Sequence, residues 1–335
     1  MSENILTVKD LKTYFYTASG IAKAVDGVSF NIAKGETMGI VGESGSGKSV
    51  TSSSIIRLLP PRTGKIVGGS IEFEGKDVLA LSKKELNDFR GKDIAVIFQD
   101  PMTSLDPVFK IGKQMTEMIM AHQNVTKDEA WKMAVEALSK VGIPEPEKRM
   151  NSYPYELSGG MCQRVIIAMA VCCKPKLIIA DEPTTALDVT IQAQILELMQ
   201  DLQKKLGMAV ILVTHDLGVI ADMCDNIIVM YGGRICERGT AREIFYNPKH
   251  EYTKGLLRSI PNGSNMKKKL VPIAGTPINM LNLPAGCAFC TRCDAAMKIC
   301  LTEHPDELTI NENHKAACWV NTRDRLMAEG GEGNV

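Results

Sequence analysis

The amino-acid sequence predicts an α/β fold: a core with a mostly parallel sheet, an antiparallel β subdomain, a helical subdomain and a small cysteine-rich C-terminal extension. Three observations predict it. Between residues 177 and 222, short apolar runs alternate with segments of helical period, as in βαβ units. Residues 38–41 form a short apolar run that leads directly into a glycine-rich loop. Residues 7–30 alternate apolar and polar side chains, as half-buried antiparallel strands do.

The glycine-rich loop is followed by a predicted helix and two predicted strands. Residues 50–59 form the helix, and Pro60 with Pro61 ends it, because proline cannot continue a helix. Apolar runs at 70–73 and 94–98 predict the strands. The first hundred residues are therefore expected to be rich in strands.

The middle of the chain has the period of helices. From Val108 to about Val141, apolar residues recur at a spacing near 3.6, and residues 161–173 form another predicted helix. A helical subdomain is expected over about residues 100–172. The βαβ region that follows has predicted strands at 177–180 and 210–214 and predicted helices at 191–206 and 217–222.

A domain boundary is predicted near residue 260. Residues 261–265 are polar and turn-rich, and the lysines at 267–269 follow, which is typical of a solvated linker. The main domain is therefore assigned to residues 1–260 and the extension to residues 261–335.

The composition restricts the classes of function. The 335-residue chain is 44% hydrophobic and has a formal net charge of zero, so it offers no positive field to a nucleic-acid backbone. We expect no nucleic-acid partner. The apolar runs are far shorter than the roughly 20 residues of a membrane-spanning helix, and residues 1–4 lack a signal-peptide pattern. A cytoplasmic, reducing location is expected, where the ten cysteines would not form disulfides.

Residues 42–49 fit the phosphate-loop pattern G-x-x-x-x-G-K-[ST]. In this pattern small residues let backbone N–H groups turn toward phosphate oxygens, a lysine reaches the terminal phosphates, and a hydroxyl holds Mg²⁺. Lys48 and Ser49 take those last two roles here. The expected ATP-binding residues of this segment are Gly42, Ser44, Gly45, Gly47, Lys48, Ser49 and Val50. The loop alone predicts a nucleoside triphosphatase.

A second motif narrows this class. Leu157-Ser158-Gly159-Gly160 lies between the phosphate loop and the apolar run that ends in Asp181-Glu182. With this order of motifs the chain resembles the ATP-binding subunit of ABC transporters. The resemblance implies an ABC-type nucleotide-binding domain of the P-loop NTPase class, with ATP and Mg²⁺ as cofactors and ATP hydrolysis as its activity.

Catalysis of ATP hydrolysis is mostly positioning and charge stabilisation of the transferring γ-phosphoryl group. Asp181 ends an apolar strand and can bind Mg²⁺ through water, and Glu182 is placed to act as the base toward the attacking water. The order matches the family's Walker B strand and catalytic glutamate. The resemblance implies that His215 is the switch histidine, which contacts the γ-phosphate and holds Glu182 and the water in register. It also implies that Gln99 is the Q-loop glutamine, which touches Mg²⁺ and the water and couples to the membrane partner.

An adenine base needs an aromatic platform, which the first predicted strand offers in Tyr14-Phe15-Tyr16. By its spacing to the strand start, Phe15 best matches the family's stacking aromatic. The alternative is that Phe15 faces the core and that Tyr14 or Tyr16 stacks on the base.

The resemblance also implies an assembly. In the family, the signature residues Ser158, Gly159 and Gly160 bind the γ-phosphate held by the opposite subunit, and Asp188 belongs to the D-loop that crosses the interface. Because this chain has one set of motifs, it must pair head to tail with a copy of itself or with a related subunit. Where the family often has arginine, this chain has Cys162, which removes a positive charge near the partner's nucleotide.

The cysteines fall into two groups. Five are expected to be small buried residues: Cys162, Cys172, Cys173, Cys224 and Cys236. The other five have the spacing C-x2-C-x2-C-x6-C-x17-C between residues 287 and 318, which favours iron–sulfur ligation and leaves zinc or unligated cysteines as alternatives. The tail resembles the C-terminal extension of oligopeptide and dipeptide transporter ATPases. That match implies a 4Fe-4S cluster held by Cys287, Cys293, Cys300 and Cys318, with Cys290 unmatched.

Further segments, residues 187–192, 247–248 and 252–257, match the peptide and nickel importer group. Nickel-type subunits usually lack the cysteine-bearing tail, so import of oligopeptides or dipeptides is preferred, and a nickel or other small-solute importer is the alternative. A soluble ABC ATPase acting on nucleic acid or ribosomes is disfavoured, because the chain has neither two cassettes nor a long coiled coil. An iron–sulfur redox sensor is a third class. The preferred reading implies a second ATPase subunit, two membrane permeases and, indirectly, a peptide-binding protein, at the cytoplasmic face of the membrane.

Overall fold

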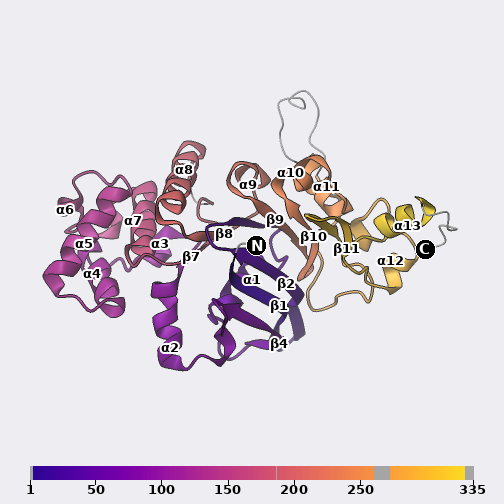
Figure 1. Cartoon of the computed structure of the whole chain (residues 1–335), viewed down its shortest axis with the longest axis horizontal. Helices are drawn as coiled ribbons and strands as arrows, with labels where there is room; N and C mark the ends of the chain where they lie inside the picture. Colours follow the sequence, from indigo (N-terminus) through magenta and orange to yellow (C-terminus); the bar gives the residue numbers. More distant parts are fainter. Residues whose placement is uncertain (1–2, 186, 260–271, 329–335) are drawn as a thin grey trace. The chain divides into compact units, whose positions relative to one another are not determined.

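The computed structural model describes residues 3–185, 187–259 and 272–328 (Figure 1). The chain divides into two compact units. Unit 1 contains the described residues within 1–5, 32–36 and 74–212, and unit 2 those within 6–31, 37–73 and 213–335. The predicted linker at 261–265 and the lysines at 267–269 lie outside the described residues. The proposed boundary at residue 260 stays a prediction.

Unit 1 has a parallel sheet in its core. Strands β6 (Ile94–Ile97) and β7 (Leu177–Asp181) pair in parallel, with Ile94 opposite Leu177 and Ile97 opposite Ala180. Strand β8 (Ala209–Thr214) is the next neighbour of β7, and the chain passes from unit 1 to unit 2 within it. Their side chains are almost all buried, as in a parallel sheet that is covered on both faces. The prediction of a parallel core is confirmed.

About half of unit 1 is α-helical (Figure 1). Helix α5 begins with a capping box, in which the Thr126 hydroxyl and the Glu129 side chain each bind the other residue's backbone N–H. Helices α4 and α7 both pack on α5. This confirms the predicted helical region. The elements are α2 (Lys83–Asp88), α3 (Pro101–Ser104), α4 (Ile111–His122), α5 (Lys127–Lys140), α6 (Pro146–Arg149), α7 (Gly159–Cys172) and α8 (Val189–Leu206), with the two-residue strand β5 (Lys76–Asp77).

Unit 2 contains an antiparallel sheet from the N-terminal part of the chain. Strands β2 (Gly20–Ala33), β1 (Asn4–Thr17) and β4 (Gly64–Phe73) are adjacent in that order. Strands β1 and β4 are antiparallel, with Leu6 opposite Phe73. Buried and exposed side chains alternate along them, as predicted.

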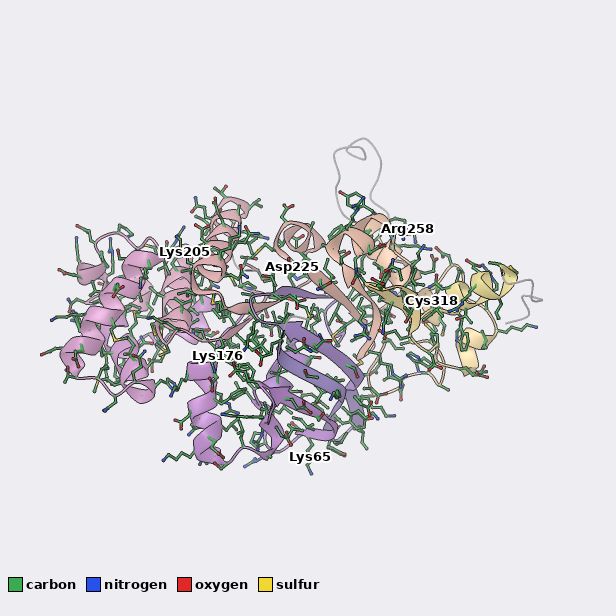
Figure 2. The ribbon with its side chains drawn as sticks, in the orientation of Figure 1. Lys65, Lys176, Lys205, Asp225, Arg258 and Cys318 are labelled. Atoms are coloured by element: carbon green, nitrogen blue, oxygen red, sulfur yellow. The ribbon has the colours of Figure 1, made fainter. Side chains whose placement is uncertain are left out.

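A second sheet region of unit 2 has the strand order β11-β12-β10-β9-β3. Strand β3 is parallel to β9, with Ile40 opposite Ile228, and the remaining neighbours are antiparallel. Asp225, labelled in Figure 2, accepts a hydrogen bond from the Thr37 N–H at 2.9 Å and fixes the start of this pair. The strands are β3 (Thr37–Val41), β9 (Asn226–Tyr231), β10 (Arg234–Thr240), β11 (Leu308–Asn311) and β12 (His314–Ala316).

The last two strands belong to the cysteine-rich extension, so the extension adds strands to the sheet of unit 2, which the sequence did not predict. The helices of unit 2 are α1 (Lys48–Ile55), α9 (Leu217–Met223), α10 (Ala241–Tyr246), α11 (Glu251–Arg258), α12 (Ile299–Thr302) and α13 (Trp319–Ala328). Helix α1 is shorter than predicted, because Arg57 adopts a left-handed backbone (φ 54°) before the prolines are reached. In the described ranges, no helix is both long and apolar enough to span a membrane.

Candidate functional site

The phosphate loop follows β3 and ends in the first turn of α1, and its backbone requires glycine at two positions. Gly42 has φ 152°, and a Cβ there would lie 2.2 Å from the Met230 carbonyl oxygen. Gly47 has φ 105°, and a Cβ would lie 2.4 Å from the Ala24 carbonyl oxygen. Both distances are well below van der Waals contact, so the loop closes only with glycine.

The buried ammonium group of Lys48 lies within this loop. The Lys48 side chain is 4% exposed, and its Nζ donates to the carbonyl oxygens of Gly42 at 2.7 Å and Glu43 at 3.0 Å. Ser49, at the start of α1, is exposed. In the described part of the chain, the buried Ser46 hydroxyl has no hydrogen-bond partner. An ammonium group beside the N-terminus of a helix is suited to binding phosphate.

The proposed catalytic glutamate lies just after β7 in unit 1. Glu182 has φ 50°, a left-handed backbone that a glutamate rarely adopts and that often marks functional sites. Gln99 Nε2 donates to Glu182 Oε2 at 3.0 Å, and the Thr185 hydroxyl donates to the same oxygen at 2.9 Å. The structure therefore brings together two predicted site residues, Gln99 and Glu182, whose direct contact the sequence analysis did not predict. Thr185 was not singled out as a partner of Glu182.

The signature residues form the start of α7. Ser158 caps the helix, because its Oγ accepts a hydrogen bond from the Met161 N–H at 3.3 Å. Ser158 and Gly159 are exposed, whereas a Cβ on Gly160 would lie 2.8 Å from Ile191. This exposed serine and glycine can be reached by a ligand from outside the chain.

Two neighbours of the signature have structural roles that the sequence did not show. Cys162 is fully buried, and its thiol donates to the Pro154 carbonyl at 3.4 Å. Asp188 caps α8 by accepting from the Ile191 N–H at 3.0 Å. Ala186, inside the predicted D-loop, lies outside the described residues.

The predicted ATP-site residues divide between the two units. Unit 2 contains Phe15, the predicted ATP-binding residues from Gly42 to Val50, and His215, which is exposed after β8. Unit 1 contains Gln99, Ser158, Gly159, Gly160, Asp181, Glu182 and Asp188.

The three aromatic residues near the end of β1, Tyr14, Phe15 and Tyr16, differ in their contacts and in their exposure. The Tyr14 hydroxyl donates to Asp26 at 2.7 Å, and burial together with that carboxylate raises the pKa of Tyr14 to about 12. Phe15 is half-buried, and Tyr16 is exposed with Lys65 Nζ 5.4 Å from its ring centre. Phe15 and Tyr16 thus both present ring surface, and the choice of Phe15 stays a prediction.

The cysteine tail is described in full between residues 287 and 318. Burial raises the pKa of the Cys287 thiol to about 12, and the nearby Cys300 and Cys318 thiols contribute to the rise. Burial also raises the pKa of Cys236, with Cys287 and Cys318 again nearby, so a cysteine outside the predicted set belongs to this neighbourhood. Figure 2 labels Cys318 just before α13.

The predicted metal centre is not supported by this arrangement. Across residues 3–185, 187–259 and 272–328, no three His, Cys, Asp or Glu side chains form a group that could hold a metal ion. The spacing of the cysteines along the chain is that of a ligand set, but the described structure does not bear out the expected cluster. Of the five scattered cysteines, Cys162, Cys224 and Cys236 are buried as predicted, whereas Cys172 and Cys173 are half-buried.

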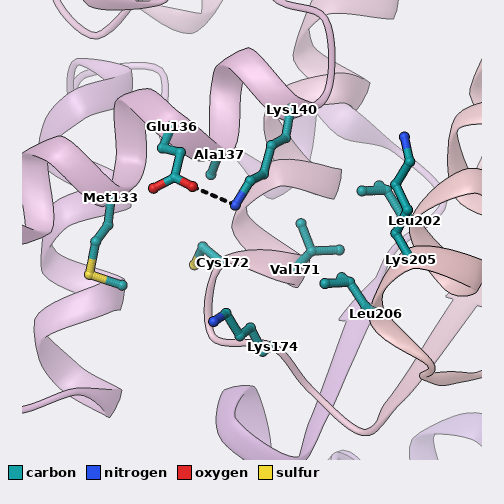
Figure 3. Close-up of a pocket in the computed structure, with 10 residues that line it drawn as sticks. All are labelled: Met133, Glu136, Ala137, Lys140, Val171, Cys172, Lys174, Leu202, Lys205 and Leu206. Carbon is teal, nitrogen blue, oxygen red and sulfur yellow. Dashed lines mark ion pairs between the residues drawn. The ribbon is translucent and has the colours of Figure 1, made fainter.

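A pocket of about 360 Å³ lies in the helical part of unit 1 (Figure 3). Its lining comes from α5, from the end of α7 with Lys174 after it, and from α8; Glu136 and Lys140 form an ion pair of 2.7 Å at its edge. No residue of the predicted ATP site lines it. It is therefore separate from the predicted chemistry.

The phosphate loop surrounds a buried lysine, a glutamate that binds a glutamine follows a parallel strand, and a helix begins with an exposed serine and glycine; together these define an ABC-type ATPase of the P-loop class. Family comparisons agree. The ABC transporter family model matches residues 25–185, and the model for the oligopeptide/dipeptide transporter C-terminal region matches residues 236–300.

Known proteins give the same result. The chain is 54% identical over 317 residues to the oligopeptide transport ATP-binding protein OppD of Bacillus subtilis, covering 94% of this chain and 88% of that protein. It is 50% identical over 318 residues to the dipeptide transport ATP-binding protein DppD of Bacillus subtilis, covering 95% of each. The dimeric ATP-binding cassette MJ0796 bound to ADP and Pi matches with a TM-score of 0.63 at 29% identity, over 71% of this chain and 99% of that one. The chain therefore belongs to the ABC transporter family, among the oligopeptide and dipeptide transport ATP-binding proteins.

Proposed function

We propose that this chain is the ATP-hydrolysing, energy-coupling subunit of an ABC importer for oligopeptides or dipeptides. The observation that carries the proposal is the pairing of an intact ATPase site with a tail that matches the oligopeptide/dipeptide transporter C-terminal region. Curated relatives of nearly full length are oligopeptide and dipeptide transport proteins, which favours peptides over nickel as the substrate.

In the proposed mechanism, the chain's own residues position ATP and water. Lys48 would leave the loop carbonyls to bind the terminal phosphates, and Ser49 and Asp181 would hold the Mg²⁺. Mg²⁺ would neutralise charge on the phosphate oxygens. Glu182 would accept a proton from the attacking water. Gln99, which is hydrogen-bonded to Glu182, would hold this base in place and couple changes at the ATP site to the membrane subunits.

The proposed assembly is a head-to-tail pair of ATPase subunits on two permeases at the cytoplasmic face of the membrane, with an external peptide-binding protein as an indirect partner. The exposed Ser158 and Gly159 support this, because such a helix start can bind the γ-phosphate of a second subunit. The MJ0796 cassette is a dimer, which supports the pairing. The partner is proposed to be a related but different chain.

Uptake in the source organism tests the proposal. The gene is deleted, and uptake of a labelled tripeptide and of labelled nickel is measured with and without a plasmid copy. Peptide uptake should be lost, return with the wild-type chain and stay absent with Glu182→Gln. Loss of nickel uptake with intact peptide uptake would reject the peptide assignment in favour of the nickel alternative.

We propose the metal centre as a separate hypothesis, which rests on the cysteine spacing and on the resemblance of the tail to the C-terminal extension of peptide transporter ATPases. It assigns a 4Fe-4S cluster to Cys287, Cys293, Cys300 and Cys318, with zinc as the alternative. Iron, sulfide and zinc are measured after anaerobic purification of the intact chain and of a Cys293→Ser, Cys318→Ser variant. About four irons and four sulfides per chain, lost in the variant, would support the cluster. Zinc without sulfide, or no metal, would reject it.

A further inference from the structure

The cysteine tail contacts the phosphate loop through one ion pair within unit 2. Arg292, directly before Cys293, donates from Nη1 and Nη2 to the two carboxylate oxygens of Glu43, at 2.5 Å and 3.0 Å. Glu43 is the second residue of the phosphate loop. The two parallel bonds form a fork, which is the strongest and most directional pairing available to arginine. The contact joins positions 249 residues apart in the sequence.

The tail itself holds Arg292 in place. Its side chain is 3% exposed, and its Nε and Nη2 donate to the carbonyl oxygens of Ala274 and Ile273 at 2.9 Å and 3.3 Å. The guanidinium also lies 5.9 Å from the ring centre of Phe289. The guanidinium also donates from Nη1 to the Tyr231 hydroxyl of β9 at 3.3 Å. Because its remaining contacts outside the phosphate loop come from tail residues, its position still depends on how the tail is folded.

Glu43 is held from three sides. Its carboxylate binds Arg292, its backbone N–H donates to the Tyr252 hydroxyl at 2.7 Å, and its carbonyl accepts from Lys48 Nζ at 3.0 Å. Tyr252 is fully buried and packs its ring against Phe289 of the tail. One of the two carbonyl oxygens that accept from the Lys48 ammonium therefore belongs to a residue that the tail anchors.

Arg292 also neutralises the negative charge of Glu43, in addition to holding the residue in place. A carboxylate in the second position of a phosphate loop would repel the bound triphosphate. Arg292 neutralises that carboxylate and holds it by both oxygens. Without Arg292, the Glu43 carboxylate would be an anion without its arginine partner beside the ATP site. Glu43 would then be held only through its backbone N–H and carbonyl groups.

We propose that Arg292 is a positioning residue for the phosphate loop, and that the C-terminal tail uses it to set the affinity of the loop for the phosphates of ATP. The inference rests on the proposed assignment of residues 42–49 as the ATP site. It assigns to the tail a role in nucleotide binding that needs no metal ion.

A second ion pair of the same kind provides a matched control. Arg238 in β10 makes a fork to Glu307 of the tail, and this pair also joins the body of unit 2 to the extension. It does not involve a phosphate-loop residue. Loss of either arginine removes one fork between body and tail, but only Arg292 fixes Glu43.

The test is binding of a fluorescent ATP analogue, with Mg²⁺, to the full-length chain, together with ATPase kinetics. Arg292→Ala should raise the Kd at least tenfold and raise KM far more than it lowers kcat. Arg238→Ala should stay within twofold of wild type. Adding Glu43→Gln to Arg292→Ala should recover part of the lost affinity, because the unpaired negative charge is removed. If Arg292→Ala does not fold, Arg292→Lys replaces it, with an expected Kd at least threefold above wild type.

Several outcomes would overturn the proposal: an Arg292→Ala Kd within twofold of wild type, an equal loss in Arg238→Ala, or a further loss when Glu43→Gln is added. A fall in kcat at unchanged KM would also overturn it, since that is the signature of a smaller folded fraction. Lys48→Ala separates this inference from the site assignment. If Lys48→Ala binds the analogue as wild type does, the assignment of the loop fails; if it loses binding while Arg292→Ala does not, only the present inference fails.

Discussion

Replacing Glu237 with glutamine should destabilise unit 2 by about 3 kcal/mol, because hydrogen bonds to a buried carboxylate are lost and a buried donor is left unpaired. Glu237 is fully buried in β10. Its carboxylate accepts hydrogen bonds from the backbone N–H groups of Lys249 at 2.6 Å and His250 at 2.9 Å, and His314 Nε2 of β12 lies 2.7 Å away. Because a carboxylate only accepts, His314 is the donor. A glutamine amide would point an N–H₂ group at one of these donors.

The magnitude is bounded from the same geometry. Each hydrogen bond to a charged group contributes about 1.5–3 kcal/mol, and the three bonds of Glu237 are not additive. The matched control is Glu307→Gln. Glu307 pairs with Arg238 of β10, but its side chain is 30% exposed, so loss of this ion pair should cost about 1 kcal/mol or less.

Urea unfolding followed by tryptophan fluorescence measures both variants. Trp319 lies in α13 of unit 2, and Trp131 lies in α5 of unit 1, so a Trp131→Phe background makes the signal specific to unit 2. A Glu237→Gln midpoint equal to that of Glu307→Gln would refute the reasoning. Burial alone would raise the pKa of Glu237, but its hydrogen bonds lower it below the usual value. The Glu237 contribution is therefore present at neutral pH and should be lost as the pH falls through the lowered pKa.

Burial lowers the pKa of His250 to about 4, so the folded state holds this side chain neutral. The free energy of unfolding should therefore fall as the pH drops from about 6.5 to 4. His250→Asn can still cap α11, and it should flatten that part of the pH–stability curve. Glu182→Gln should reduce ATPase turnover at least about 100-fold while the ATP Kd changes little, and equal turnover would exclude Glu182 as the base. Gly42→Ala should abolish binding of the fluorescent analogue, because its Cβ would overlap the Met230 carbonyl; wild-type affinity would contradict the geometry.

The local chemistry of the ATP site could be predicted because each motif is a contiguous segment. Within such a segment the residue types, such as glycine, indicate which backbone conformations are required. The glycines of the phosphate loop are required by their backbone angles and close contacts, as their spacing predicted. The pairing of Gln99 with Glu182 could be expected because both follow adjacent parallel strands, whose ends meet at one edge of a sheet. The left-handed backbone of Glu182 could not, since nothing in the sequence around it marks a non-glycine residue for that conformation.

Long-range pairings were not predictable. The partner of Glu43 is 249 residues away, and an arginine beside a cysteine motif suggests a metal-site neighbour rather than a phosphate-loop anchor. Strands β11 and β12 are four and three residues long, too short for their alternation to be distinguished from a loop. The cysteine spacing predicted a ligand set, but spacing fixes only how far apart thiols can be and not whether they converge.

These pairings lead to a last prediction, for a chain truncated after residue 259. Strand β12 pairs with β10, Ala317 N–H donates to the Cys236 carbonyl at 2.8 Å, and the tail supplies His314 to Glu237. Removing the tail would expose the edge of β10 and leave Glu237 buried without its imidazole partner. The truncated chain should therefore aggregate or lose ATP affinity, as measured by size-exclusion chromatography and analogue binding. A monodisperse truncated chain with wild-type affinity would show that the tail is an independent appendage, and it would contradict both the Glu237 and the Arg292 arguments.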